Sequence, residues 1–308
     1  MTDVTEINET EPARRLHARA RLRPGAALLA TLPLAVCSLV APLSPMPPWA
    51  LMWALAITLW VAFKFLAWLQ AAENRPRAWR LAAYFLWPGM DARAFSSPSI
   101  QTPRRHDFSP WRSALLRAFA GLILLGTAAQ GAGHPLAAGW LAITGLILTL
   151  HFGSFDLLAA AWNRAGIPVR PLMDAPWRSR NLAEFWGRRW NRGFSDVARF
   201  AVFQPLARRL GPATGTMAGF AFSGLLHELV LSLPARGGFG GPLLYFLIQG
   251  AAVCALRHRG AALPPVLDRF LTGVIVLAPA FLLFHPPFLE RVLLPFLRVL
   301  IPLGTPIS

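Results

Sequence analysis

FAFSGLLHELVLSL, residues 220–233, is an apolar run with two ionisable residues at its centre. Leu, Phe, Val and Ala make up most of the run, and His227 and Glu228 interrupt it once. Ionisable side chains at bilayer depth are costly, and by default they face the protein interior at a functional site. The run therefore indicates a membrane helix that carries such a site.

The composition of the whole chain is that of a membrane protein. Of the 308 residues, 55% are hydrophobic and only 14% are charged, against about 25% charged in soluble domains. Several apolar runs approach the roughly 20 residues that a helix needs to cross the hydrocarbon core. We expect an all-α, multi-pass integral membrane protein with about eight transmembrane helices (seven to nine) and amphipathic helices at the interface. The expected spans are residues 25–43, 48–70, 113–130, 136–161, 212–233, 242–257, 263–284 and 288–303.

The net charge of +16 comes almost entirely from arginine, because Lys64 is the only lysine. In a soluble protein this charge indicates nucleic-acid binding. Here the arginines lie between apolar runs, on the side that the positive-inside rule makes cytoplasmic. We therefore expect no nucleic-acid partner and a cytoplasmic amino terminus. A basic arm over residues 1–24 precedes one membrane domain over 25–308, and the arginine bias and retained first span are compatible with a bacterial inner membrane.

Polar residues and cysteines also occur singly within the apolar runs, and each can be interpreted without a catalytic role. Lys64 lies near the cytoplasmic end of its run and is expected to snorkel to the surface. Cys37 and Cys254 are expected to be small buried hydrophobes. His151 and Asp156 are five positions apart, so they are not neighbours on one helical face.

His227 shares a helical face with small residues. Gly219 and Ser223 precede it at intervals of four, and Gly224 lies on its other flank. Small residues in such rows indicate close helix packing, but a bare turn beside an imidazole also offers space for a substrate. Glu228 points about 100° away, so we expect it to pair with an arginine or a backbone donor of another helix. HELVL lacks the second histidine of a zinc helix, so no metal is expected.

A second constellation is FWGRRWN, residues 185–191, within the polar and aromatic segment 162–210. We expect part of this segment to be an amphipathic helix in the interface. Tryptophan and arginine are common anchors at that level. Asn191 is different, because a neutral amide both donates and accepts and can orient a carbonyl or a hydroxyl without adding charge.

FWGRRWN followed roughly 30 residues later by SGLLHEL resembles the membrane-bound O-acyltransferase superfamily, and most closely its wax-synthase-like branch. The resemblance covers about residues 150–260. It implies an all-helical enzyme that moves a fatty acyl group from acyl-CoA, as co-substrate, to the hydroxyl of a lipophilic alcohol, with no cofactor and no metal. On the residues that match, it implies that His227 is the catalytic histidine and that Asn191 is its polar partner.

The chemistry agrees with these roles. An alcohol is a weak nucleophile and needs its proton removed as it attacks. His227, kept neutral by apolar surroundings, accepts that proton, and Asn191 hydrogen-bonds the oxyanion, the acceptor or His227. Arginine suits the phosphates of CoA. The candidate substrate-binding residues are Trp186, Arg188, Arg189, Trp190, Arg192, Ser223 and Gly224.

Two other functions remain open at this point. A transporter or channel would use His227, Glu228 and Lys64 as a proton or ion path. A membrane scaffold would use His227 only as a structural side chain.

Overall fold

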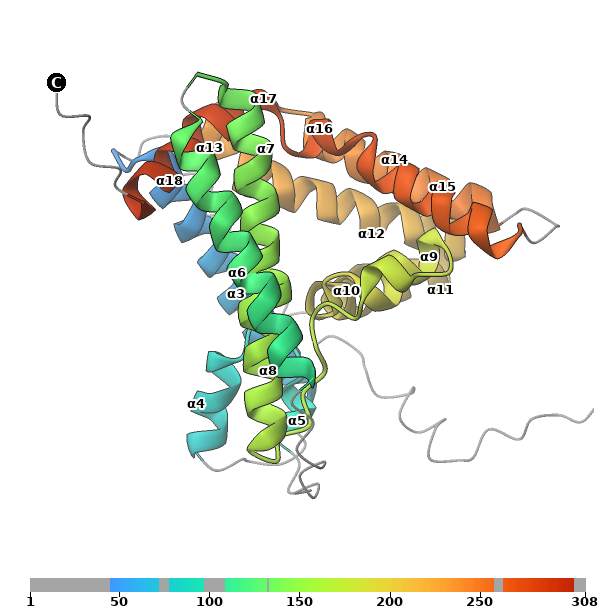
Figure 1. Cartoon of the computed structure of the whole chain (residues 1–308). Helices are drawn as coiled ribbons and strands as arrows, with labels where there is room; N and C mark the ends of the chain where they lie inside the picture. The colour runs from blue at the N-terminus through green and yellow to red at the C-terminus, as the bar shows by residue number, and fades with distance from the viewer. Residues whose placement is uncertain (1–44, 72–77, 97–108, 132, 258–262, 302–308) are drawn as a thin grey trace, which may run out of the picture.

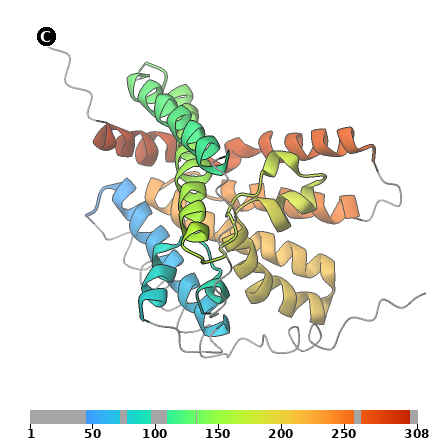
Figure 2. The same ribbon diagram turned by 60° about the horizontal axis from the view of Figure 1, so that its bottom comes forward.

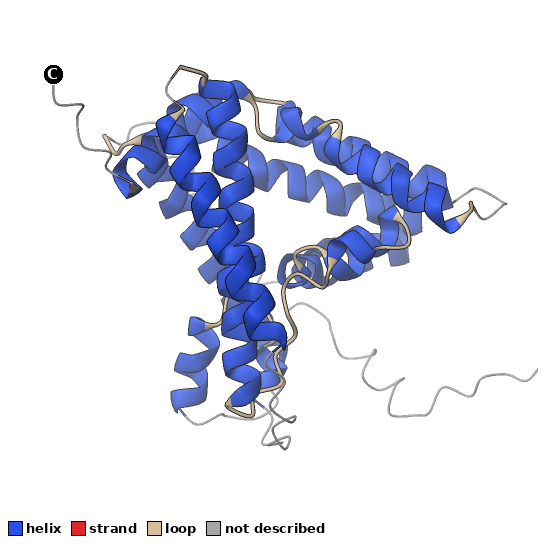
Figure 3. Ribbon diagram, in the orientation of Figure 1, coloured by secondary structure: helices blue, strands red, loops and turns tan. Residues whose placement is uncertain are grey.

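The computed structural model consists of helices and connecting segments, with no strand in the part of the chain that it describes (Figure 3). Two expectations, the basic arm at 1–24 and the first span at 25–43, lie outside that part, as does Cys37. The described residues are 45–71, 78–96, 109–131, 133–257 and 263–301.

Among the described residues, five helices are long and apolar enough to cross a membrane, which identifies an integral membrane protein. They coincide with five of the expected spans to within a few residues. The segments are Pro48–Gln70 within α3 (Pro48–Ala71), Trp111–Gln130 within α6 (Ser109–Gln130), Pro135–Arg164 across α7 (Pro135–Leu146) and α8 (Phe155–Arg164), Pro212–Ala235 across α12 (Pro212–His227) and α13 (Leu233–Ala235), and Pro265–Leu283 across α15 (Pro265–Leu277) and α16 (Ala280–Leu283).

Two further expected spans are shorter helices. α14 (Gly241–Arg257) is apolar and lies on α12. The expected span 288–303 is a helical run made of α17 (Pro286–Phe288), a π-helical turn and α18 (Leu294–Leu300). Leu289, Val292 and Leu293 in this run are buried in the largest apolar core. The number of about eight spans therefore stays a prediction.

The helices form two groups that meet at this core (Figure 1). α6 lies alongside α7 and α8, and α12, α14 and α15 extend away from them, as the second view also shows (Figure 2). α6 approaches the α7 segment closely, because a Cβ atom added to Gly121 would lie 2.6 Å from the carbonyl oxygen of Gly145. In a bilayer the lipid tails are as apolar as the side chains, so the hydrophobic effect does not hold helices together. Helices there associate by close packing through small residues.

Lys64 does not snorkel to the surface, which corrects the prediction. Its side chain is fully buried, and Nζ donates hydrogen bonds of 2.6 Å to the carbonyl oxygens of Tyr84 and Gly89. The ammonium also lies 3.6 Å from the centre of the Tyr84 ring. Lys64 therefore fastens to α3 both α4 (Ala78–Leu86) and the segment that leads from it to the short helix α5 (Ala92–Ser96).

The segment 162–210 is more divided than the expected amphipathic helix. After α8 the chain is irregular, and then forms α9 (Leu182–Glu184) and a π-helical turn. A longer continuous helical run extends from Arg192 to Leu210, through α10 (Arg192–Ala198), a π-helical turn and α11 (Gln204–Leu210). In Figure 1 these elements lie beneath α12, and α10 and α11 contact it. The two sequence motifs are thereby brought to adjacent elements.

Candidate functional site

His227 is the last residue of α12, and its own helix fixes its orientation. Nδ1 lies 2.7 Å from the carbonyl oxygen of Ser223, one turn earlier. A carbonyl oxygen only accepts, so Nδ1 carries the proton and donates, and the neutral ring then has its lone pair on Nε2. The ring is half-buried, with its centre 4.6 Å from that of Phe246 on α14.

The small residues beside His227 serve different purposes. Ser223 is buried and its hydroxyl donates to the carbonyl oxygen of Gly219 at 3.1 Å. The space beside Gly224 is filled, since an added Cβ atom would lie 2.8 Å from the Cα atom of Leu243. Gly224 therefore allows α12 to pack on α14 and leaves no open space, contrary to the substrate-space interpretation. Open space occurs at Gly219, where an added Cβ atom would meet nothing within 4 Å.

Glu228 binds backbone donors of another helix, as predicted. Its Oε1 accepts hydrogen bonds from the backbone N–H of Gly240 at 2.8 Å and of Leu243 at 3.1 Å. These N–H groups lie at the start of α14, where helical amides lack intrahelical partners and a carboxylate is favourable. Oε2 is buried without a partner in the described structure. Glu228 thus ties the turn after His227 to the start of α14.

The second motif approaches the first through aromatic contacts. Trp186 lies on a π-helical turn, Phe185–Arg189, and its Nε1–H donates to Oε1 of Gln249 on α14 at 3.1 Å. The Trp186 ring is 5.7 Å from the ring of Phe246, the same ring that contacts His227. Phe246 therefore joins Trp186 of the second motif, FWGRRWN, to His227 of the first.

Trp190 lies between two other rings. It stacks on Phe185, with centres 5.6 Å apart and planes 14° apart. Its ring is also 6.3 Å from His151 at 15°. His151 lies in a π-helical segment, Ile147–Ser154, between α7 and α8. In the sequence His151 is notable only for its spacing from Asp156, and the structure pairs Asp156 with Arg117 at 3.1 Å. An ionisable residue in an apolar run was the signal that pointed to His151.

Asn191 adopts a left-handed backbone conformation, with φ of 40°. Asparagine tolerates this region better than most residues. Its Oδ1 accepts a hydrogen bond of 3.3 Å from the N–H of Phe194 and so caps α10. Its amide Nδ2 has no partner in the described structure. One half of the amide is thus structural, and the other half is available to a ligand.

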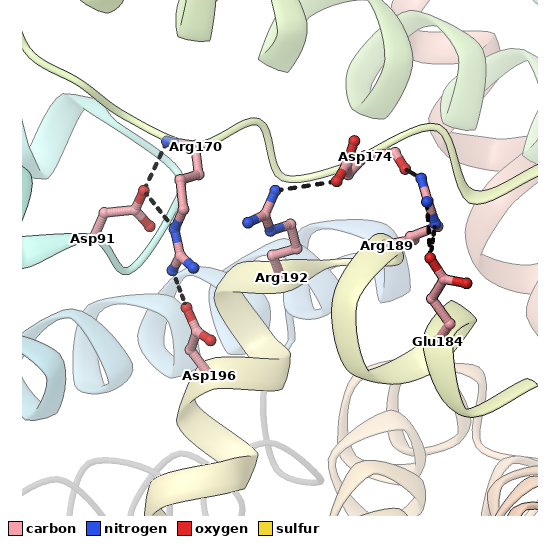
Figure 4. A network of polar contacts seen from close by, with 7 residues as sticks. All are labelled: Asp91, Arg170, Asp174, Glu184, Arg189, Arg192 and Asp196. Atoms are coloured by element: carbon pink, nitrogen blue, oxygen red, sulfur yellow. Dashed lines mark hydrogen bonds and ion pairs between the residues drawn. The ribbon is translucent and has the colours of Figure 1, made fainter. Parts of the chain in front are cut away.

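The three candidate arginines differ in their partners, and Figure 4 shows two of them, Arg189 and Arg192. Arg189 contacts Glu184 at 2.8 Å and donates to the carbonyl oxygen of Asp174. Arg192 lies 3.4 Å from the carboxylate of Asp174. Arg188 is exposed, and its guanidinium has no partner among the described residues.

Two carboxylates in this network have shifted pKa values. Burial opposes ionisation of Glu184, but hydrogen bonds from the Arg180 backbone and the Arg189 guanidinium outweigh it, so the pKa of Glu184 is lowered. Burial raises the pKa of Asp91, and the hydrogen bond and charge of Arg170 offset only part of this effect. Arg170 also pairs with Asp196. Arg170 thus bridges the α4–α5 segment and α10, a contact that no sequence pattern indicated.

Comparisons with known proteins agree with both motifs. Residues 169–248, which include Asn191 and His227, match the model of the membrane bound O-acyl transferase family. The chain is 30% identical over 140 residues to a probable long-chain-alcohol O-fatty-acyltransferase of Arabidopsis thaliana, with 41% of each chain covered.

Two further relatives have related names. An acyl-CoA–sterol O-acyltransferase of the same plant is 29% identical over 169 residues, which cover 46% of this chain and 48% of the relative. A long-chain-alcohol O-fatty-acyltransferase of Simmondsia chinensis is 33% identical over 72 residues, 21% of this chain and 20% of the relative. The chain thus spans less than half the length of these relatives. The predicted resemblance to the wax-synthase-like branch of the superfamily is confirmed.

Proposed function

We propose that this chain, whose residues 169–248 match the membrane-bound O-acyltransferase family, transfers a fatty acyl group from acyl-CoA to the hydroxyl of a lipophilic alcohol. The single observation that carries the proposal is the 2.7 Å hydrogen bond from Nδ1 of His227 to Ser223. This hydrogen bond leaves the lone pair of Nε2 free to act as a base. An ionisable residue within an apolar helix is energetically unfavourable, so its presence there indicates a function. The names of the relatives support the reaction class.

In the proposed reaction, Nε2 of His227 takes the proton of the alcohol as its oxygen attacks the thioester carbonyl carbon. A C–O bond forms, and the carbonyl becomes a tetrahedral oxyanion. Nδ2 of Asn191, which has no partner in the described structure, donates to that oxyanion. The C–S bond then breaks, and the imidazolium returns the proton to the sulfur, so CoA leaves as a thiol. No cofactor or metal is needed for this balance.

The binding residues divide by their surroundings. Arg188 is exposed and is the strongest candidate to bind CoA phosphates. Arg189 and Arg192 would have to exchange or share their carboxylate partners to do so. Trp186 and Trp190 form apolar walls of the site, and Ser223 orients His227 through its backbone.

Further properties belong to the same proposal. The chain would cross a bacterial inner membrane about eight times. Its amino terminus would be cytoplasmic, as the charge asymmetry predicts. The acceptor is a long-chain alcohol or a sterol, because the names of the relatives include both. The transport alternative is less well supported, since Lys64 and Glu228 are each engaged by backbone groups of different segments.

The test uses membranes that contain wild type, His227→Asn or His134→Ala, supplied with labelled palmitoyl-CoA and a panel of hexadecanol, a sterol and diacylglycerol. Asparagine retains a donor for Ser223 but has no Nε2. His134 is exposed and makes no capping bond, so it is the matched control. We expect ester from wild type and His134→Ala, and about 10²–10⁴-fold less from His227→Asn. Equal ester from His227→Asn would exclude the base, and none from wild type with any acceptor would refute the reaction.

A further inference from the structure

His151 differs from the other histidines of the helical core in one respect. Its Nδ1 is buried and has no hydrogen-bond partner in the described structure. In His227 the same atom binds Ser223. In His285, Nδ1 accepts from the N–H of Phe288 and Nε2 lies 3.1 Å from the hydroxyl of Ser232. A buried polar atom without a partner destabilises the folded state, so His151 is the histidine that requires an explanation.

Packing alone does not explain a histidine at this position. The ring stacks on Trp190, and its centre is 5.4 Å from that of Phe155 in an edge-to-face contact. A phenylalanine would make both contacts without burying a polar atom. The residue also lies in the π-helical segment Ile147–Ser154, and π-helical turns within α-helices are frequent at functional sites.

The position of His151 indicates which ligand would supply the partner. Trp190, on which it stacks, directly precedes Asn191 and is two residues from the exposed Arg188. On its other side Trp190 begins a row of ring contacts that ends at His227. The successive centre distances are 5.6 Å from Trp190 to Phe185, 5.1 Å from Phe185 to Trp186, 5.7 Å from Trp186 to Phe246 and 4.6 Å from Phe246 to His227.

An acyl-CoA bound in the proposed way has its phosphates at Arg188 and its thioester at His227. The pantetheine arm joins these two ends, and its polar groups are two amides and one hydroxyl. An amide in an aromatic surrounding needs a hydrogen-bond partner, and an imidazole nitrogen without a partner needs the same. We propose that His151 binds an amide of the pantetheine arm of the acyl donor, an inference that rests on the proposed function.

The experiment compares His151→Phe and His151→Asn with wild type. Phenylalanine keeps the stacking and removes the nitrogen, whereas asparagine keeps a polar group near the position of Nδ1. With acyl-CoA we expect His151→Phe to raise KM about tenfold with kcat changed less than threefold, and His151→Asn to recover part of the loss. With an S-ethyl thioester of the same fatty acid, which has no amide, His151→Phe and wild type should be equal.

A binding measurement separates this inference from the proposed function. A thioether analogue of palmitoyl-CoA, which cannot react, is titrated into each variant in lipid nanodiscs. Weaker binding by His151→Phe than by wild type supports the inference even if wild type makes no ester, in which case only the proposed reaction fails. Equal affinity of the two, or an equal KM for acyl-CoA, would overturn the role of His151. A purely structural role predicts that His151→Phe is at least as stable as wild type and kinetically unchanged.

Discussion

The end of α12 and the network around Arg170 and Arg189 both hold charged or ionisable side chains, but they satisfy them differently. At the end of α12, His227 and Glu228 bind backbone groups, a carbonyl oxygen in one case and two N–H groups in the other. In the network, guanidinium groups face carboxylates (Figure 4). At the end of α12 the partners are backbone groups, whereas in the irregular segment after α8 they are opposite charges.

This difference follows from the surroundings of each region. Removing two charges from water costs several kcal/mol each, and an ion pair repays this only with excellent geometry. A backbone partner is held in place by its helix, and it is neutral, so no second charge has to be removed from water. Near water an exposed ion pair forms cheaply but contributes only about 0–1 kcal/mol. The catalytic candidate His227 is therefore held by the rigid kind of partner, and the candidate binding residues Arg189 and Arg192 by the exchangeable kind.

Lys64→Met should have the largest effect on stability. Lys64 is a fully buried cation whose hydrogen-bond partners are backbone carbonyl oxygens. The substitution leaves the carbonyl oxygens of Tyr84 and Gly89 without their donor. At about 1–3 kcal/mol for each buried unsatisfied group, the loss is about 2–6 kcal/mol. Thermal unfolding in detergent measures it. An unchanged Tm would mean that water replaces the ammonium, and that the anchoring of the α4–α5 segment lies elsewhere.

Substitutions of Asn191 separate the capping role of its Oδ1 from the proposed donor role of its Nδ2. Asn191→Asp keeps the capping oxygen and removes the Nδ2 donor, so activity should fall about 10²–10³-fold while the Tm stays near that of wild type. Asn191→Gly suits the positive φ but removes both groups, so it should be as inactive. Ester assays and thermal unfolding on the same preparations measure both effects. Full activity of Asn191→Asp would contradict the donor role.

Glu228 is expected to act through its oxygen rather than through its charge. Glu228→Ala should cost about 0.5–2 kcal/mol, the range for loss of a helix cap, whereas Glu228→Gln keeps an acceptor for Gly240 and Leu243 and should cost less. The Tm of the three proteins gives the order. If glutamine were as damaging as alanine, the charge would be the essential feature and the comparison with the ionic network would fail.

Arg192→Gln should have the smallest effect. Its contact with Asp174 is 3.4 Å long and the carboxylate is half exposed, so we expect a change below about 1 kcal/mol that disappears at high salt. Unfolding at low and high ionic strength measures it, with Arg188→Gln as the control that removes no intramolecular partner. A large, salt-independent loss would show that this pair behaves like a buried one.

Glu184 adds a pH dependence to the same network. Its pKa is lowered in the folded state, so its contribution to stability is present above its ordinary value of 4.5 and is lost as the pH falls through the folded value. Glu184→Gln should remove that part of the acid dependence of the Tm. An identical pH profile for variant and wild type would place the acid sensitivity in other groups.

Local pattern was sufficient to predict the helices of the described spans, because length and apolarity are read within one segment. It failed wherever the partner was distant in sequence. Lys64 was expected to snorkel because nothing nearby revealed the carbonyl groups at 84 and 89. Gly224 was interpreted as open space because Leu243, which fills it, belongs to another helix.

The candidate site was predictable to the same degree. His227 and Asn191 were identified from the motifs, and a backbone donor for Glu228 was anticipated from its direction on the helix. The pairing of Asp91 with Arg170, and the stacking of His151 on Trp190, join residues far apart in the chain. No periodicity encodes such contacts, so only the three-dimensional structure brings them together.

The empty position at Gly219 is an attachment point for a reporter. It lies on the helix that carries His227, eight residues earlier, which is about 12 Å along the axis. An introduced cysteine would meet nothing within 4 Å at its Cβ atom, so a spin label or fluorophore can be mounted there without disturbing the contact of α12 with α14. Spectroscopy in a native-like bilayer would then follow the arrival of a lipid substrate in real time.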